Sequence, residues 1–253
     1  MKYITLLIGA FLLMAPARAN ANSIEPSLDP TMKTAPVSSV MTQVEEKVRS
    51  AAVKVVRSGS RSGHGSGALV NYKGLTLVFT AQHVADGILG GTYYAIKSHE
   101  VKPAILIYSD ELHDIAILYL VEPFNYVKPL KFSPRKGILE VGEEITYSAF
   151  PADHRLLTFR GRVAGYEILS DAGLQILLNT QGWFGCSGSL VYDVNGDIVG
   201  VLWGIDVQAA RSLNIDQVVL DNLMWVSPIQ NINMELALSS LCESLNNKHR
   251  ACR

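Results

Sequence analysis

The sequence has almost no net charge, few cysteines, and no apolar run after residues 4–14 that is long enough to cross a bilayer. Lys and Arg number 22 and Asp and Glu 23, so the formal net charge is −1. This balance gives no support for binding to nucleic acid or to a membrane surface. The sequence shows no metal-ligand cluster, phosphate-binding loop, cofactor motif or internal repeat. We therefore expect no metal, no cofactor, no nucleic-acid partner and no membrane contact after export.

The amino-terminal segment has the pattern of a secretory signal peptide. Lys2 precedes the apolar run 4–14, which is followed by small residues with Ala-x-Ala patterns ending at Ala19 and Ala21. An uncleaved anchor is the alternative. Loss of residues 1–21 removes Lys2, Arg18 and no acidic residue, which changes the net charge from −1 to −3. We expect a periplasmic or secreted protein.

The three cysteines fall into two groups. Cys242 and Cys252 lie near each other in the carboxy-terminal tail and are candidates for a disulfide, which an oxidising compartment would permit. Cys186 is left unpaired, and its simplest interpretation is a small buried apolar residue.

The stretch 182–191 contains Gly185-Cys186-Ser187-Gly188 and leads into an apolar strand. A serine hydroxyl acts as a nucleophile only with a base, a group that orients the base, and donors for the oxyanion. A candidate base, His83, ends Thr-Ala-Gln-His after an apolar run, and Asp114 opens Asp-Ile-Ala-Ile-Leu. Asp110 and Glu111 are alternative acids, but only Asp114 heads this pattern.

These three motifs, in the order His83, Asp114, Ser187, resemble those of a trypsin-like peptidase, and most of all the bacterial HtrA/Deg and glutamyl-endopeptidase branches, over residues 50–232. The resemblance implies an endopeptidase that forms an acyl-enzyme on Ser187, with His83 as base and Asp114 orienting it. It also implies an oxyanion hole formed by the Gly185 and Ser187 amides. Cys186 as nucleophile is the alternative, but the family places the nucleophile two residues after glycine. Digestive trypsins have Asp at the position of Cys186, so we expect their amino-terminal activation switch to be absent.

The resemblance also predicts a substrate pocket formed by Thr180, Gln181, Trp203 and Gly204. Thr180 and Gln181 are uncharged, which does not support cleavage after Lys or Arg, and we hypothesise a small or medium apolar residue at P1. A different class of function stays open at this point, namely a catalytically silent trypsin-like domain that binds peptides or proteins.

Many short strands with Gly and Asn turns predict an all-β fold. The resemblance implies two six-stranded antiparallel β-barrels, about 50–125 and 140–232, in a peptidase domain over 49–233. Residues 22–48 are expected to form a flexible leader, although 44–56 also has the pattern of a short helix that continues into the first strand. Residues 234–253 are expected to form a short helix and tail, without a PDZ domain.

Three local predictions are also open to test. Residues 157–163 are expected to form a strand, a turn and a second strand. Asn195-Gly196 is expected to form a hairpin turn. His64 is expected to lie on a loop, outside the site.

Overall fold

The computed structural model describes residues 41–59, 63–152, 154–208, 218–244 and 250–252. The predicted signal peptide, 1–21, lies outside the described residues, as does the leader up to residue 40. The first described element is helix α1 (Gln43–Ala51), which continues directly into the first strand.

The first barrel contains six antiparallel strands: β1 (Ala52–Arg57), β2 (Gly65–Tyr72), β3 (Leu75–Thr80), β4 (Thr92–Lys97), β5 (Glu100–Asp110) and β6 (Ile115–Leu120). Their order is β1-β4-β5-β6-β3-β2, and pairing of β2 with β1 closes the ring. The short strand β7 (Leu130–Lys131) adds to β2 in parallel. A 3-10 turn, η1 (Gln82–Val84), follows β3 and carries the candidate base.

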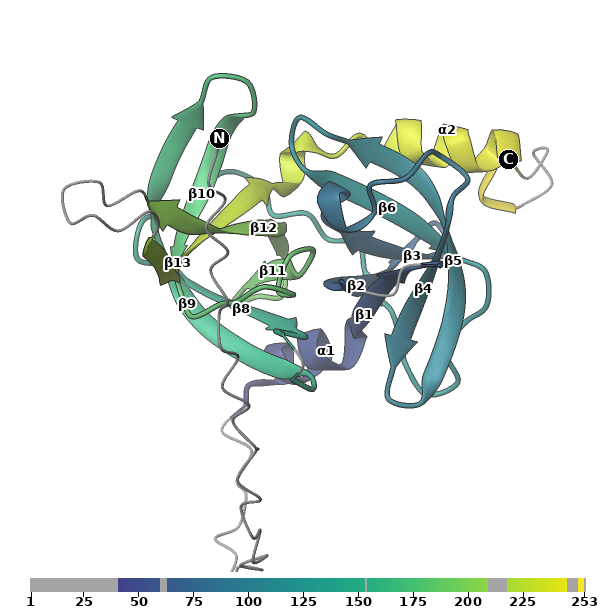
Figure 1. Ribbon diagram of the computed structural model, residues 1–253, viewed down its shortest axis with the longest axis horizontal. Coiled ribbons are helices and arrows are strands. Elements are labelled where there is room, and N and C mark those ends of the chain that lie inside the picture. Colours follow the sequence, from purple (N-terminus) through teal and green to yellow (C-terminus); the bar gives the residue numbers. More distant parts are fainter. Residues whose placement is uncertain (1–40, 60–62, 153, 209–217, 245–249, 253) are drawn as a thin grey trace, which may run out of the picture. The chain divides into compact units, whose positions relative to one another are not determined.

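The second barrel has the strands β8 (Glu144–Ala149), β9 (Leu157–Leu169), β10 (Gly173–Asn179), β11 (Leu190–Asp193), β12 (Ile198–Gln208) and β13 (Val218–Pro228). They close in the order β10-β13-β12-β11-β8-β9. Figure 1 shows this barrel on the left and the first barrel on the right. The predicted all-β fold with two six-stranded antiparallel barrels is confirmed.

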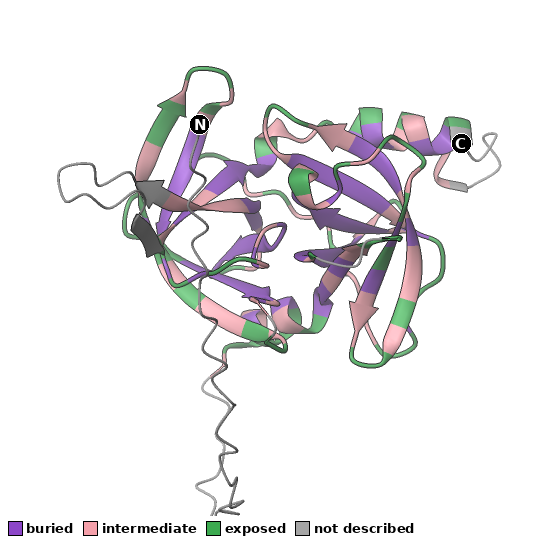
Figure 2. Cartoon of the chain, viewed as in Figure 1, coloured by how far each residue is buried: buried purple, intermediate pink, exposed green. Residues whose placement is uncertain are grey.

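Each barrel has its own apolar core, and a third cluster joins the two. Val53, Val78 and Leu118 belong to the first core, and Ile145, Leu178 and Val226 to the second. The third cluster combines side chains of β2 and β3 with those of β11, β12 and helix α2. The buried segments follow the strands in Figure 2. This joint core fixes one barrel against the other, so loops from the two barrels can form a single site.

The leader predicted over 22–48 is wrong for its last residues, because α1 already begins at Gln43. Thr42 caps the helix: its hydroxyl accepts from the Glu45 N–H, and the Glu45 carboxylate accepts from the Thr42 N–H. Glu45 also pairs with Arg160 of β9, and this hydrogen-bonded guanidinium lowers the pKa of Glu45 from 4.5 to about 2. The helix is therefore attached to the second barrel by an ion pair as well as by apolar packing.

The carboxy-terminal segment begins beside β12 of the second barrel, and its helix packs on β5 of the first barrel. It comprises η3 (Ile229–Asn231), α2 (Met234–Ser244) and η4 (Arg250–Cys252). Leu241 of α2 is buried in the joint core, and a disulfide joins Cys242 to Cys252. None of the helices in the described ranges has the length and apolar character that a bilayer span requires.

The prediction of a turn within 157–163 is wrong. Strand β9 runs unbroken from Leu157 to Leu169. Gly161 lies where β9 crosses the end of β10, and a Cβ there would be 2.5 Å from the Asn179 carbonyl oxygen. The glycine allows a close approach between two backbones and does not mark a turn. At the other predicted turn, Gly196 has φ +85° between β11 and β12.

Candidate active site

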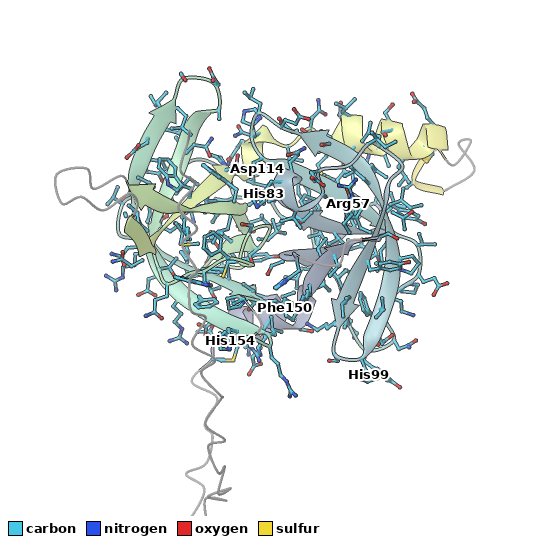
Figure 3. All side chains as sticks on the ribbon, in the orientation of Figure 1. Arg57, His83, His99, Asp114, Phe150 and His154 are labelled. Carbon is cyan, nitrogen blue, oxygen red and sulfur yellow. A yellow bond between two sulfur atoms is a disulfide. The ribbon has the colours of Figure 1, made fainter. Side chains whose placement is uncertain are left out.

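His83 and Asp114 lie in contact with each other at one edge of the first barrel. His83 lies on η1, and Asp114 immediately precedes β6. The His83 Nδ1 and the Asp114 Oδ2 are 2.6 Å apart, and the His83 backbone N–H donates to Asp114 Oδ1 at 2.8 Å. Figure 3 shows the two side chains together. Because Nδ1 donates to the carboxylate, the neutral ring carries its free acceptor lone pair on Nε2.

Asp114 occupies an unusual backbone conformation, with φ +53°. Aspartate enters this left-handed region more readily than most residues do. The other two candidate acids take different positions. Asp110 is 2.7 Å from Nδ1 of His113, and Glu111 is exposed. Of the three acids, Asp114 is the one that contacts His83.

Ser187 lies on the loop between β10 and β11 of the second barrel, and two glycines shape that loop. Gly185 has φ +96° and Gly188 has φ +92°. A Cβ on Gly185 would be 2.6 Å from the Phe150 carbonyl oxygen, and one on Gly188 would collide with the Ser66 carbonyl oxygen. Both positions therefore require glycine for their backbone angles and for space.

Ser66 of the first barrel holds this loop in place. Its N–H donates to the Ser187 carbonyl oxygen at 2.8 Å, and its hydroxyl donates to the Gly185 carbonyl oxygen at 2.7 Å. The same hydroxyl accepts from the Phe150 N–H at 2.8 Å. Ser66 was not among the predicted site residues.

The backbone amides of the loop divide into two sets. The N–H groups of Cys186, Gly188 and Ser189 donate to backbone carbonyl oxygens. Within the described part of the chain, the N–H groups of Gly185 and Ser187 have no acceptor. These two amides are therefore available to an oxygen atom of a ligand, as an oxyanion hole requires.

A cleft of about 380 Å³ brings the two barrels' polar residues together. It is lined by Val55, Arg57, Gly63, His64, His83, Val84, Asp86, Phe184, Gly185 and Ser187. The Ser187 hydroxyl donates to the Trp203 carbonyl oxygen at 3.1 Å. In this structure the hydroxyl is thus turned toward the second barrel, while His83 lies in the same cleft.

His64 lies on a loop as expected, but its ring belongs to the cleft. Its Nε2 is 2.8 Å from the Phe150 carbonyl oxygen, where it must donate. The ring lies under the Gly185 backbone. The sequence alone gave no signal for this, because the contact joins residues from different barrels.

Cys186 points away from the cleft. It is fully buried in the second core, and burial raises the pKa of its thiol to about 11. A buried neutral thiol is a poor nucleophile. The disposition of Cys186 therefore matches its interpretation as a small buried apolar residue.

The four residues predicted for the substrate pocket do not line the cleft that contains His83 and Ser187. Thr180 and Gln181 line a separate, larger cavity of about 940 Å³, between α1, β8 and β9. The Trp203 indole N–H donates to the side-chain oxygen of Gln175 at 3.0 Å. Gly204 follows Trp203 on β12. That Thr180, Gln181, Trp203 and Gly204 bind substrate stays a prediction.

The described residues include no group of three or more His, Cys, Asp or Glu side chains that could hold a metal ion.

Comparison with known proteins places this site in a family. The sequence model of the trypsin-like peptidase domain matches residues 65–201. Among solved structures, the inactive form of the Rv3671c protease of M. tuberculosis is 17% identical, with a TM-score of 0.57, over 77% of this chain and 91% of that chain. The HtrA-type protease AlgW with a tripeptide is 16% identical, with a TM-score of 0.61, over 80% of this chain and 63% of that one.

At these identities the solved structures show the fold alone, and this chain spans less than two thirds of the AlgW structure. A search of curated proteins finds no match. The family assignment rests on the matched domain, which covers more than half of the chain. This chain belongs to the trypsin-like peptidase domain family, and it is a peptidase.

Proposed function

We propose that this peptidase is a serine endopeptidase in which Ser187 is the nucleophile, His83 the general base and Asp114 the residue that orients His83. The Gly185 and Ser187 N–H groups form the oxyanion hole. The substrate is a protein or peptide, with a small or medium apolar residue at P1.

The reaction follows from the atoms in the cleft. The Ser187 hydroxyl turns from the Trp203 carbonyl oxygen toward His83 Nε2 and attacks the substrate carbonyl carbon. His83 takes the hydroxyl proton and then gives it to the leaving amine, so the peptide bond breaks and an acyl-enzyme forms. Water, deprotonated by His83, then releases the acyl group. Asp114 holds the Nδ1–H and stabilises the imidazolium.

The observation that carries the proposal is the 2.6 Å contact between His83 and Asp114, in a cleft that also contains Ser187. Two N–H groups without an acceptor in the described part of the chain lie on the same loop as this serine. Loss of a single oxyanion donor typically costs about 10²–10³ in rate, so such a pair accounts for a large part of catalysis.

The test is hydrolysis of a peptide library with varied P1 residues by wild type, Ser187→Ala and Ser189→Ala. Ser189 is a matched control, because its buried hydroxyl donates to the Ser148 carbonyl oxygen instead of facing the cleft. We expect turnover by wild type and Ser189→Ala and none by Ser187→Ala. Fastest cleavage after Lys or Arg would contradict the P1 hypothesis. Peptide binding without turnover by folded wild type would contradict the proposed reaction and indicate a silent binding domain.

We also propose that the protein is exported and loses residues 1–21. The charged and apolar pattern of that segment supports this, as does the Cys242–Cys252 disulfide, which suits an oxidising compartment. Amino-terminal sequencing of protein from the native host should begin at Asn22. A mature chain that begins at Met1 would contradict the proposal.

A further inference from the structure

We propose that Tyr147 is a positioning residue, whose buried hydroxyl fixes the loop that presents the Gly185 and Ser187 N–H groups. This inference rests on the proposed function, because it assigns a role toward the oxyanion hole.

The Tyr147 ring is itself held rigidly. It lies on β8 and has no exposed surface. Its ring stacks on that of Phe159, which faces it across the β8–β9 pairing, with centroids 4.9 Å apart and planes at 19°. A hydroxyl at the end of such a ring has a fixed position relative to the barrel.

That hydroxyl contacts the start of the loop. It donates to the Gln181 carbonyl oxygen. It would lie 3.3 Å from a Cβ on Gly182. The phenol thus binds the chain where it leaves β10, and the Tyr147 side chain belongs to the same buried core as Cys186, the residue just before Ser187. Any shift of this stretch would move the two free amides with it.

The other hydrogen bonds that hold this stretch lie further along it, where the Phe184 carbonyl oxygen accepts from the Ala152 N–H and the Gly185 carbonyl oxygen accepts from the Ser66 hydroxyl. Gln181, Trp183 and Phe184 are exposed, with 44% of Trp183 and 63% of Phe184 accessible. The neutral Cys186 thiol offers no ion pair. The Tyr147 hydroxyl is therefore the buried polar anchor at the start of the loop.

The Tyr147 phenol can act as a hydrogen-bond donor at every working pH. Burial raises the pKa of Tyr147 far above its usual value, so the hydroxyl keeps its proton and remains a donor over the whole range in which a peptidase works. Loss of this donor would deprive the Gln181 carbonyl oxygen of its hydrogen bond to the rigid barrel.

The experiment compares Tyr147→Phe with Tyr192→Phe. Tyr192 is the matched control, because its ring is also fully buried but its hydroxyl has no hydrogen-bond partner in the described structure. Each change removes one oxygen atom, and only the first removes a hydrogen bond to the loop. The readouts are kcat and KM on a peptide that wild type cleaves, the rate of fluorophosphonate labelling, and the thermal unfolding midpoint.

We expect Tyr147→Phe to lower kcat and the labelling rate by about 10- to 100-fold with KM changed less than about threefold, as for a small misplacement of reacting groups. Tyr192→Phe should match wild type in both. Wild-type kcat and labelling in folded Tyr147→Phe would overturn the inference, as would an equal loss in Tyr192→Phe.

If Tyr147→Phe does not fold, Phe159→Leu replaces it, since this variant keeps the hydroxyl but removes the ring stacked on Tyr147. A fall in kcat at unchanged KM supports the inference, and wild-type kcat in folded Phe159→Leu overturns it. Wild type that neither cleaves peptide nor reacts with the probe would overturn the proposed function and this inference with it.

Discussion

Replacement of Ser66 by alanine should weaken both stability and catalysis, because this residue connects the first barrel to the nucleophile loop. The alanine keeps the backbone N–H that donates to Ser187, but it removes the hydroxyl. That hydroxyl donates to the Gly185 carbonyl oxygen at 2.7 Å and accepts from the Phe150 N–H at 2.8 Å. The Gly185 carbonyl oxygen and the Phe150 N–H therefore both lose their hydrogen-bond partner.

The magnitude follows from the burial of these groups. An unsatisfied buried polar group costs roughly 1–3 kcal/mol. Ser66 is fully buried, but Gly185 and Phe150 are half-buried, so water can reach part of their surface. We expect Ser66→Ala to lower the free energy of unfolding by about 2 kcal/mol. A freed Gly185 peptide should also lower kcat by about tenfold, which corresponds to about 1.4 kcal/mol of activation free energy.

The assay is urea unfolding together with steady-state peptide hydrolysis. Ser148→Ala is the control, because Ser148 is also buried and its hydroxyl shares a hydrogen bond with Thr158 at 3.0 Å, away from the nucleophile. This control should lose stability and keep its kcat. If Ser66→Ala retained wild-type stability and kcat, or if Ser148→Ala lost as much kcat, the assigned role of Ser66 would be wrong.

Three further predictions concern other parts of the molecule. Asp114→Asn should lower kcat by about 10⁴-fold, because an amide donor at this position forces His83 into the wrong tautomer. Steady-state peptide hydrolysis by the folded variant measures this loss, and a much smaller loss would contradict the role of Asp114. The pKa of Glu45 is lower in the folded than in the unfolded chain, so its ion pair stabilises the fold above pH 4.5 and is lost as the pH falls toward 2. Acid unfolding of Glu45→Gln should then depend less on pH over that range, and an unchanged profile would contradict the assignment. Replacement of Cys242 and Cys252 by serine opens a link between residues 10 apart and should lower the free energy of unfolding by roughly 2–3 kcal/mol, measurable by urea unfolding.

The sequence was most informative where chemistry requires a fixed local pattern. The motifs around His83, Asp114 and Ser187 predicted the fold and identified residues that the structure brings into contact or into one cleft. At Gly185 and Gly188 the motif and the structure agree, because only glycine fits the backbone angles and crowded surroundings found there.

It was least informative where a role depends on a partner far along the chain. Tyr147 has the pattern of an ordinary core residue in an alternating strand, and its hydroxyl acquires a role only when the 180–186 stretch folds over it. Gly161 had the appearance of a turn, whereas the neighbouring β10 backbone requires it. The pattern over 44–56 predicted a short helix that continues into the first strand, and α1 and β1 confirm it. The predicted leader ran on to residue 48 because the residues before the helix have a leader-like composition, although the Thr42 and Glu45 capping pair marks the helix start.

The most direct test of the central claim is to react the purified mature protein with a fluorophosphonate probe and to locate the adduct by peptide mass spectrometry. An activated serine reacts with such a probe, whereas an ordinary serine does not. We predict one adduct per chain, on Ser187, and no adduct in Ser187→Ala. An adduct on Cys186 or on another residue, or a folded wild type that stays unlabelled, would contradict the account.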